Sequence, residues 1–544
     1  MSFESIVAGI SERKPDADQK SLKAVKAFFQ FPVIPEYLPS EVLMASCYRA
    51  LGFASLRDVS VSQNGKALWK LVSTEEEIPP APFNRNEVRR LLRDVLLSPE
   101  DPSQKRGQKY PDFLFLAPLV PATALFSNPI RLNRNANSSG GTPWNVDTLL
   151  KALISYSSLD NADSENLWNC LFSALSVQDD NKDDFFARII EHLLQEYAKQ
   201  LKESGRVDAA NLPVWTKNQN DIASQGKQFL HFLDREAFSG QSPLDEIRNG
   251  LRLVLDLKPM FSRWQWLTIL DAHLRMSMMA FMMWLLDLHH VASLAIQRYV
   301  LGEKQIPAIP SRDFIQQLCS ESHEDCKEDF FFYGEGFSKA QVRIVTRYAR
   351  DMIRIAFFLD AAKELNPVKF NSLDWTTVEG FVSSLKSFVP EFHAPEIRKD
   401  FEKGYVTIAD AEKNVLNYRK GRLKHFLEFF AVLRQKTVID GQRDFIRYDQ
   451  SFFVRKKGRY SRAPFIVDLG SVSCFTVAYC CANGRRVFPK KDLKAYLEKF
   501  FIKIRSAHND QFVGHLKGLG LTMDSPDADD GLMILNPFFR EGKR

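Results

Sequence analysis

An apolar run of eleven residues, interrupted only by Ser277, constrains the fold of this chain more than any other feature. The run spans Met276 to Leu286 and reads MSMMAFMMWLL, and polar residues follow at once at Asp287, His289 and His290. A helix that crosses a bilayer needs about 20 apolar residues, so the run is too short for a membrane span. A helix that is apolar all round is instead buried. The run therefore predicts a core helix in a protein without a membrane partner.

Helical periodicity dominates the middle of the chain, from Trp144 to about Tyr418. Long helices are expected over Trp264–Leu301 and Gln341–Leu365, because apolar residues recur there every three or four positions. No internal repeat of fixed period is present, which disfavours a regular solenoid. The middle of the chain is therefore expected to be a helical domain of irregular architecture.

The pattern changes after about Arg419, where short strands appear. Strands are expected over Phe445–Val454, Phe465–Leu469, Cys474–Cys481, Leu519–Met523 and Leu532–Leu535, and helices over Lys490–Ile504 and Gln511–Lys517. A helix, a turn, a second helix and a hairpin in this order predict a winged-helix-like module.

The expected fold class is α+β, predominantly α-helical, with three domains. They are a mixed α/β N-terminal region (1–143), a helical middle domain (144–418) and a basic α+β C-terminal module (419–544). Polar loops at 98–112 and 133–143 mark the end of the first. The seven cysteines are scattered and odd in number, which favours reduced thiols over disulfides. No signal peptide is expected at the N-terminus, so the predicted location is cytoplasmic.

Charge is distributed very unevenly along the chain. Between Arg419 and Arg505 there are 21 basic and 7 acidic residues, an excess of +14 within 87 residues. The whole chain carries +6, so the other 457 residues sum to −8. Such a cluster repels itself unless a partner neutralises it. A phosphate backbone does so by direct pairing and by release of counterions.

Two groups of basic residues are candidate contacts with that backbone. The first, at a predicted hairpin tip, comprises Arg455, Lys456, Lys457, Arg459 and Arg462. The second, around a helix start that itself attracts phosphate, comprises Arg485, Arg486, Lys490, Lys491 and Lys494. The aromatic residues interleaved with them are Phe452, Phe453, Tyr460, Phe488 and Tyr496. Such rings either stack on unpaired bases or belong to the core.

Metal ligands are suggested at two places and expected at neither. Cys319, His323 and Cys326 would share one helix face, but a structural zinc site takes four ligands and no CxxC pair lies nearby. The acidic turn from Asp524 to Asp530 lacks the spacing of a calcium loop, and turns favour Asp for backbone reasons. The sequence therefore predicts no metal.

Catalytic motifs are equally weak. His289 and His290, with Asp287 and His273, could form a base oriented by a carboxylate, although such histidines more often hydrogen-bond within a core. No phosphate-cradling GxxxxGK[ST] loop, no GxGxxG after a strand and no GxSxG is present. No catalytic residue and no cofactor are therefore predicted, and the chain is expected not to be an enzyme.

The C-terminal part of the chain resembles a group of known proteins. The segment FVGHLKGLGLTMDSPDADDGLMILNPF, from Phe512 to Phe538, together with Asp468–Cys481, carries the resemblance. It is similar to the C-terminus of accessory proteins in bacterial anti-phage defence operons, namely DptG-type proteins of phosphorothioation-dependent restriction. The small subunits of Druantia-type systems are an equal match. Either resemblance implies a non-catalytic subunit that works beside a large helicase or ATPase.

The sequence thus predicts a nucleic-acid-binding accessory subunit of a multi-protein bacterial defence system, with DNA as the expected ligand. Two alternatives stay open. In one, the basic face docks an acidic protein partner and the chain is a structural adaptor. In the other, the chain is an unrecognised divergent nuclease.

Overall fold

A computed structural model of the 544-residue chain describes most of its second half and parts of its first. The described ranges are 3–12, 161–177, 242–302, 330–375, 378–420, 454–456, 464–524 and 532–540, with isolated positions between them. Within these ranges the protein is mostly helical with a few short strands, so the expected α+β, predominantly α-helical class is confirmed. Most of the predicted N-terminal region lies outside the described residues.

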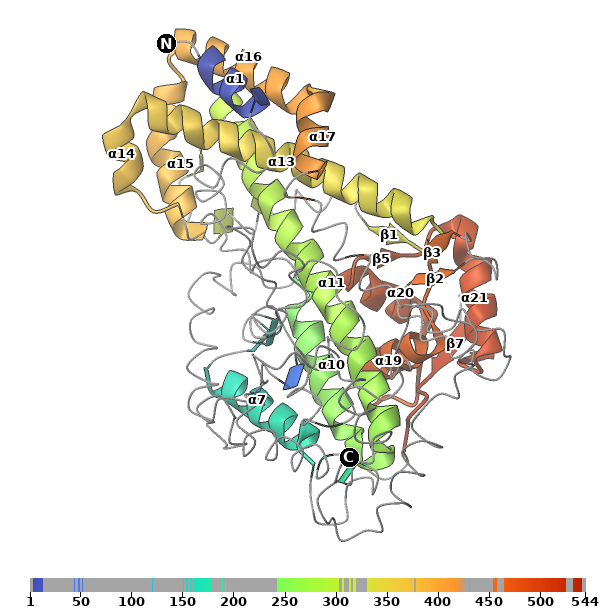
Figure 1. Cartoon of the computed structure of the whole chain (residues 1–544). Coiled ribbons are helices and arrows are strands. Elements are labelled where there is room, and N and C mark those ends of the chain that lie inside the picture. The colour runs from blue at the N-terminus through green and yellow to red at the C-terminus, as the bar shows by residue number, and fades with distance from the viewer. Residues whose placement is uncertain are drawn as a thin grey trace, which may run out of the picture.

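One long helix runs through the middle of the molecule (Figure 1). It is α11 (Arg263–Ala295), and a π-helical segment, η7 (Ile296–Leu301), continues it. A capping box starts α11: the Ser262 hydroxyl accepts a hydrogen bond from the Gln265 amide, and the Gln265 side chain accepts one from the Ser262 amide. These bonds satisfy two amide groups that the first turn of a helix leaves without partners.

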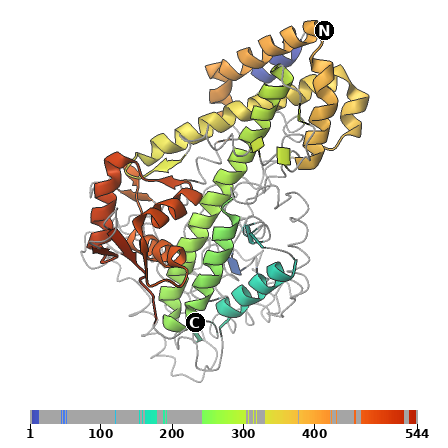
Figure 2. The same ribbon diagram turned by 180° about the vertical axis from the view of Figure 1, so that it is seen from behind.

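Helices from three different parts of the chain surround α11. They are α10 (Leu244–Asp256), α13 (Phe337–Leu365) and α19 (Ser471–Ala482). Figures 1 and 2 show α10 alongside the first half of α11 and α13 crossing its second half. The apolar run that predicted a core helix lies within α11, and its side chains are buried, so that prediction is confirmed.

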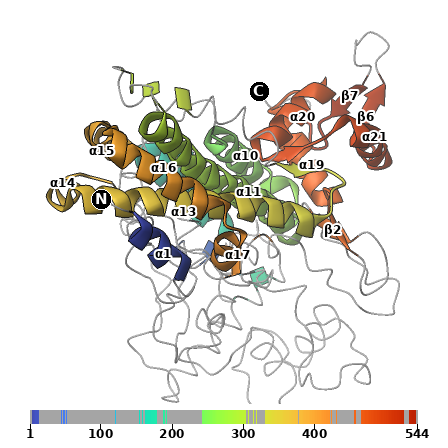
Figure 3. The ribbon, with the colours of Figure 1, turned by 90° about the horizontal axis from the view of Figure 1, so that it is seen from above.

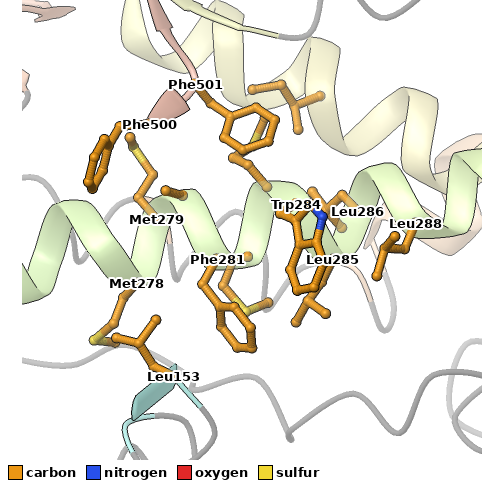
Figure 4. Close-up of a cluster of buried hydrophobic side chains, with 14 of the residues drawn as sticks. Leu153, Met278, Met279, Phe281, Trp284, Leu285, Leu286, Leu288, Phe500 and Phe501 are labelled. Atoms are coloured by element: carbon orange, nitrogen blue, oxygen red, sulfur yellow. The ribbon is translucent and has the colours of Figure 1, made fainter. Parts of the chain in front are cut away.

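Side chains leave α11 on opposite sides and meet separate parts of the core. In Figure 4, Met279 points toward Phe500 and Phe501, whereas Met278 lies beside Leu153. The helix formed by α11 and η7 has the length and composition of a membrane span, yet 89% of its most apolar stretch is buried inside the protein. The apolar surface of this helix is therefore covered by the protein's own side chains.

Smaller helices pack around α13 and the second half of α11 (Figure 3). They are α1 (Glu4–Glu12), α14 (Pro367–Ser372), α15 (Val378–Phe392), α16 (Pro395–Asp410) and α17 (Glu412–Lys420). Aromatic rings fill the space between them: Phe357 lies 5.2 Å from Phe401, and Phe3 lies 5.9 Å from Phe401, between ring centroids. We call these five helices, with α10, α11 and α13, the helical body.

The start of α11 is fastened to α7 (Asn161–Leu175). The buried guanidinium of Arg263 donates hydrogen bonds to the carbonyl oxygens of Leu175 and Ser176. A short 3₁₀ helix, η6 (Lys258–Met260), links α10 to α11. Leu175 is the last residue of α7 and Ser176 follows it, so the cation of Arg263 stabilises the C-terminal end of α7.

In its described part, the C-terminal module contains the helices α19, α20 and α21, one 3₁₀ helix and six short strands. Its elements are β2 (Val454–Lys456), β3 (Phe465–Val467), α19, β4 (Val487–Pro489), α20 (Lys490–Lys499), β5 (Ile502–Lys503), η9 (Ser506–His508), α21 (Asn509–Gly518), β6 (Thr522–Asp524) and β7 (Leu532–Leu535). Strands β4, β7 and β6 form one antiparallel sheet in that order. Strands β2 and β3 pair antiparallel, as predicted, but Arg455 and Lys456 lie within β2 and not at the predicted hairpin tip.

The predicted strand at Cys474–Cys481 was wrong, because this segment lies within α19. The segment is a short apolar run without a visible period, and such runs do not distinguish a buried strand from a buried helix. Asn483 ends the helix in a left-handed conformation with φ of 44°, and its amide donates to the carbonyl oxygen of Tyr479. Packing against α11 decides between the two structures.

The helix predicted over Lys490–Ile504 ends earlier, at Lys499. Phe501 adopts a left-handed backbone with φ of 58°, which costs an aromatic residue on the order of 1–3 kcal/mol. Its ring is buried against α11, and its carbonyl oxygen accepts a 2.9 Å hydrogen bond from the amide of Phe331. These contacts hold the strained residue and turn the chain from α20 into β5.

A backbone ladder joins the C-terminal module to the helical body. Strand β1 (Phe331–Phe332) pairs in parallel with β5. Beyond β1, the amide of Gly334 donates to the carbonyl oxygen of Val467, and the amide of Val467 donates to that of Glu335, both at 2.8 Å. Gly334 has a φ of 80°, and a side chain there would collide with the ring of His508. Residues on both sides of the predicted 418/419 boundary thus share one ladder.

Candidate nucleic-acid interface

The second predicted group of basic residues lies on α20 and just before it. Leu493 and Leu497 are four positions apart and buried, so one side of α20 faces the core. Lys491 is exposed, and Lys490 and Lys494 are half-buried. We call these three side chains the α20 lysines. They place three cations within the first five residues of the helix.

The position of the α20 lysines favours an anion for two reasons. Lys490 and Lys491 stand in the first turn of α20, directly after Pro489. The first turn of a helix already carries a partial positive charge and amides without intrahelical partners. Cations placed there are unfavourable for the helix by itself, and a phosphate bound there would neutralise both charges at once.

Arg485, which the sequence grouped with these lysines, has structural partners. Its guanidinium donates 3.2 Å hydrogen bonds to the carbonyl oxygens of Cys481 and Ala482, at the end of α19. It also forms a 2.8 Å ion pair with Asp492. Arg486 is exposed beside it. Arg485 therefore stabilises the end of α19, and its charge is partly balanced by Asp492.

Two further cations, Lys503 and Arg505, precede α21 (Asn509–Gly518), the helix to which Lys494 is bonded. Lys494 donates a 2.8 Å hydrogen bond to the side chain of Asn509, the first residue of α21. Arg505 lies four positions before Asn509 and is exposed, and Lys503 lies in β5. Lys503 and Arg505 belong to the charge excess but not to a dense cluster of basic residues, so the sequence did not mark them as a site. Only the fold places them against Phe330 and Phe332.

The first predicted group lies largely outside the described residues. Lys457, Arg459 and Arg462 are not described, and Arg455 and Lys456 are described only as backbone in β2. The prediction that Arg455 and Lys456 lie at a hairpin tip was wrong, because both belong to the paired strand β2.

The residues that the sequence suggested as metal ligands also lie mostly outside the described residues. Cys319, His323 and Cys326 are not described, nor is most of the acidic turn after Asp524. Among the described part of the chain, no group of three His, Cys, Asp or Glu side chains is placed to hold a metal ion.

Histidine and carboxylate side chains do meet between α11 and α13, but in a different pairing from the one considered in the sequence. His290 lies 3.1 Å from the carboxylate of Asp351, and Arg347 pairs with Asp287 at 2.9 Å. Burial alone would raise the pKa of Asp351. The hydrogen bond and charge of His290, with the charges of Arg347 and Arg354, outweigh burial and hold this pKa below its usual range. The network ties the two longest helices together through charge.

The other two histidines of α11 are structural. The ring of His289 donates a 2.8 Å hydrogen bond to the carbonyl oxygen of Leu285, and that of His273 donates one of 3.1 Å to Ile247. Burial lowers the pKa of each histidine to about 4. Both rings are therefore neutral at neutral pH and hydrogen-bonded within the core.

The thiols of α19 are protonated at neutral pH. Burial raises the pKa of Cys480 and of Cys481 to about 12, and it raises the pKa of Cys474 well above its usual range. A thiolate is the reactive and metal-binding form of cysteine, so these side chains act as small apolar groups.

Comparison with known proteins adds one short match. No known protein family matches the chain, and no solved structure does. A much longer protein of Mycoplasma genitalium is 34% identical to it over 73 residues. That match covers 13% of this chain and 4% of the Mycoplasma protein, which is too little to show a shared family.

Proposed function

We propose that this protein is a non-catalytic accessory subunit that binds nucleic acid, in the first place DNA, within a multi-protein bacterial anti-phage defence system. The observation that carries the proposal is the excess of +14 between Arg419 and Arg505, with the α20 lysines at the start of a helix. A surface that is rich in cations and lies beside a helix start attracts phosphate groups at short and long range. Binding of this kind does not depend on base sequence.

The order of elements in the C-terminal module supports a winged-helix-like interpretation. Helix α19, strand β4, helices α20 and α21, and strands β6 and β7 follow one another, and the sheet order is β4, β7, β6. A helix, turn, helix and hairpin were expected in this order. The turn between β6 and β7 has the sequence SPDADDG and would repel phosphate, so we assign DNA contact to the α20 lysines instead.

The defence context rests on the resemblance of Phe512–Phe538 to DptG-type and Druantia-type accessory proteins. On that interpretation the protein acts in the cytoplasm, through the C-terminal module as a separate domain, beside a large helicase or ATPase. Co-purification with the products of neighbouring genes tests this part, and recovery of the chain alone from the native host contradicts it.

Binding is tested by titrating labelled duplex DNA with the purified chain and following fluorescence anisotropy from about 50 to 200 mM salt. The decisive variant is Lys490→Glu with Lys491→Glu. Affinity is expected to fall at least tenfold, and the slope of log affinity against log salt is expected to fall by about 1.8 if each lysine contacts one phosphate. Glutamate is favoured in the first turn of a helix, so α20 keeps its stability in this variant.

Lys399→Glu with Lys413→Glu is the matched control, because both lysines are exposed on α16 and α17 of the helical body. It removes the same net charge and is expected to change affinity much less. If the wild-type chain binds no DNA or RNA even at low salt, the proposal fails and an acidic protein partner takes the place of nucleic acid. If it cleaves DNA when a divalent metal is added, the chain is a nuclease.

A further inference from the structure

The described aromatic side chains of the C-terminal module are nearly all buried or half-buried. Phe488 and Phe512 are fully buried, and the ring of Tyr496 packs 5.1 Å from that of Phe500. Among the described aromatic residues between positions 465 and 540, Phe539 alone is exposed, with 37% of its surface accessible. The interleaved rings that suggested base stacking in the sequence are, where described, occupied in packing.

Two cations lie over buried rings beside the start of α21. The guanidinium carbon of Arg505 is 3.5 Å from the ring centroid of Phe332, whose residue is 3% exposed. The ammonium of Lys503 lies 5.2 Å from the ring centroid of Phe330. A cation placed over a ring is attracted by the negative charge of its face. The protein's own cations therefore cover the ring faces of Phe330 and Phe332.

Single-stranded and double-stranded nucleic acids need different binding surfaces. Proteins that bind single strands combine cations with exposed aromatic rings on which unpaired bases stack. A duplex hides its bases and offers phosphates at twice the density along its axis, one charge per about 1.7 Å. A surface of cations over covered rings gains little from unpaired bases and much from paired strands.

We propose that the ligand of this surface is double-stranded DNA, bound through its backbone by the α20 lysines together with Lys503 and Arg505. The inference rests on the proposed function and adds the form of the nucleic acid. It also adds two contact residues that lie just before α21, whose first residue, Asn509, accepts a hydrogen bond from Lys494.

The test compares a duplex of about 20 base pairs with a thymine single strand of about 40 nucleotides, so that both probes carry the same number of phosphates. The full-length chain is titrated with each probe at equal salt. The duplex is expected to bind at least tenfold more tightly. Equal or tighter binding of the single strand overturns the duplex inference and leaves the proposed function standing. Binding of neither probe at low salt overturns both.

Arg505→Gln tests the added contacts, with Lys399→Gln on the helical body as its control. Glutamine keeps a polar side chain over Phe332 and removes the charge. Duplex affinity is expected to fall three- to tenfold and the salt slope to fall by about 0.9, whereas the control leaves both unchanged. A melting temperature equal to that of the wild type shows that the fold is intact. Unchanged duplex affinity in an intact Arg505→Gln variant removes Arg505 from the interface.

Discussion

Helices α11 and α20 have similar backbone geometry but differ in how much of their surface the protein covers. α11 is covered on nearly every side, by α10, α13 and α19, and even its histidines are hydrogen-bonded inside the core. α20 buries a narrow stripe of Leu493 and Leu497 and leaves lysines on its other side. The difference teaches that helix formation does not by itself assign a role. The fraction of the helix surface that the protein covers decides whether a residue acts on stability or on a partner.

The difference in coverage is tested most directly by making the same substitution, alanine to aspartate, in both helices. Ala280→Asp in α11 places a carboxylate where the alanine is fully buried, and the free energy of unfolding is expected to fall by about 5 kcal/mol or more. Ala495 in α20 is exposed, and Ala495→Asp is expected to lower the free energy of unfolding by about 0.5 kcal/mol or less. Urea unfolding followed by circular dichroism measures both. Similar losses in the two variants would show that α20 is covered as fully as α11.

Acid should weaken α11 through its buried histidines. Burial lowers the pKa of His273 and His289 to about 4, whereas an unfolded histidine has a pKa of about 6.5. Between these values the unfolded chain binds protons that the folded chain does not. The free energy of unfolding is therefore highest above pH about 6.5. It falls as the pH drops toward about 4, by up to roughly 3 kcal/mol for each histidine.

Urea unfolding at several pH values between about 7.5 and 4 measures this loss. The variant His273→Gln with His289→Gln should be less stable at neutral pH and should lose less stability on acidification. A wild-type protein whose free energy of unfolding does not fall across this window would contradict the assignment of both rings as neutral core groups.

A smaller effect separates the two kinds of basic residue before and within α20. Arg485→Ala removes hydrogen bonds to the last turn of α19 and should lower the free energy of unfolding by about 1 kcal/mol. Lys491→Ala, at an exposed position, should leave the free energy of unfolding within about 0.5 kcal/mol of wild type. It should weaken DNA binding instead. The idea of a structural arginine beside binding lysines fails if Arg485→Ala weakens binding and spares stability.

Periodicity predicted the elements that bury one face or all faces. The long helices α11 and α13, the helix start at Lys490 and the strand at Leu532–Leu535 follow from local pattern, because side-chain burial repeats along the chain there. The segment Cys474–Cys481 has no such repeat, so only its packing against α11 shows that it is helical.

Contacts between residues far apart in the chain could not be predicted from the sequence. His290 pairs with Asp351 across two helices, and Arg505 lies over Phe332 from another part of the chain. Neither spacing is marked by any local motif. The α20 lysines, in contrast, could be identified as a group from the sequence, because charge density along a short segment is visible without the fold. Their contact with DNA stays a prediction.

The parallel pairing of β1 with β5 bears on the order of events during synthesis. Phe331 and Ile502 are partners although about 170 positions separate them. Contacts of such long range form late, because closing a large loop costs entropy before any contact repays it. The ribosome releases β1 well before β5, and until then the side of α11 that receives Phe500 and Phe501 has no cover. The nascent chain therefore exposes its most apolar helix longest, and protection by a chaperone matters most in that interval.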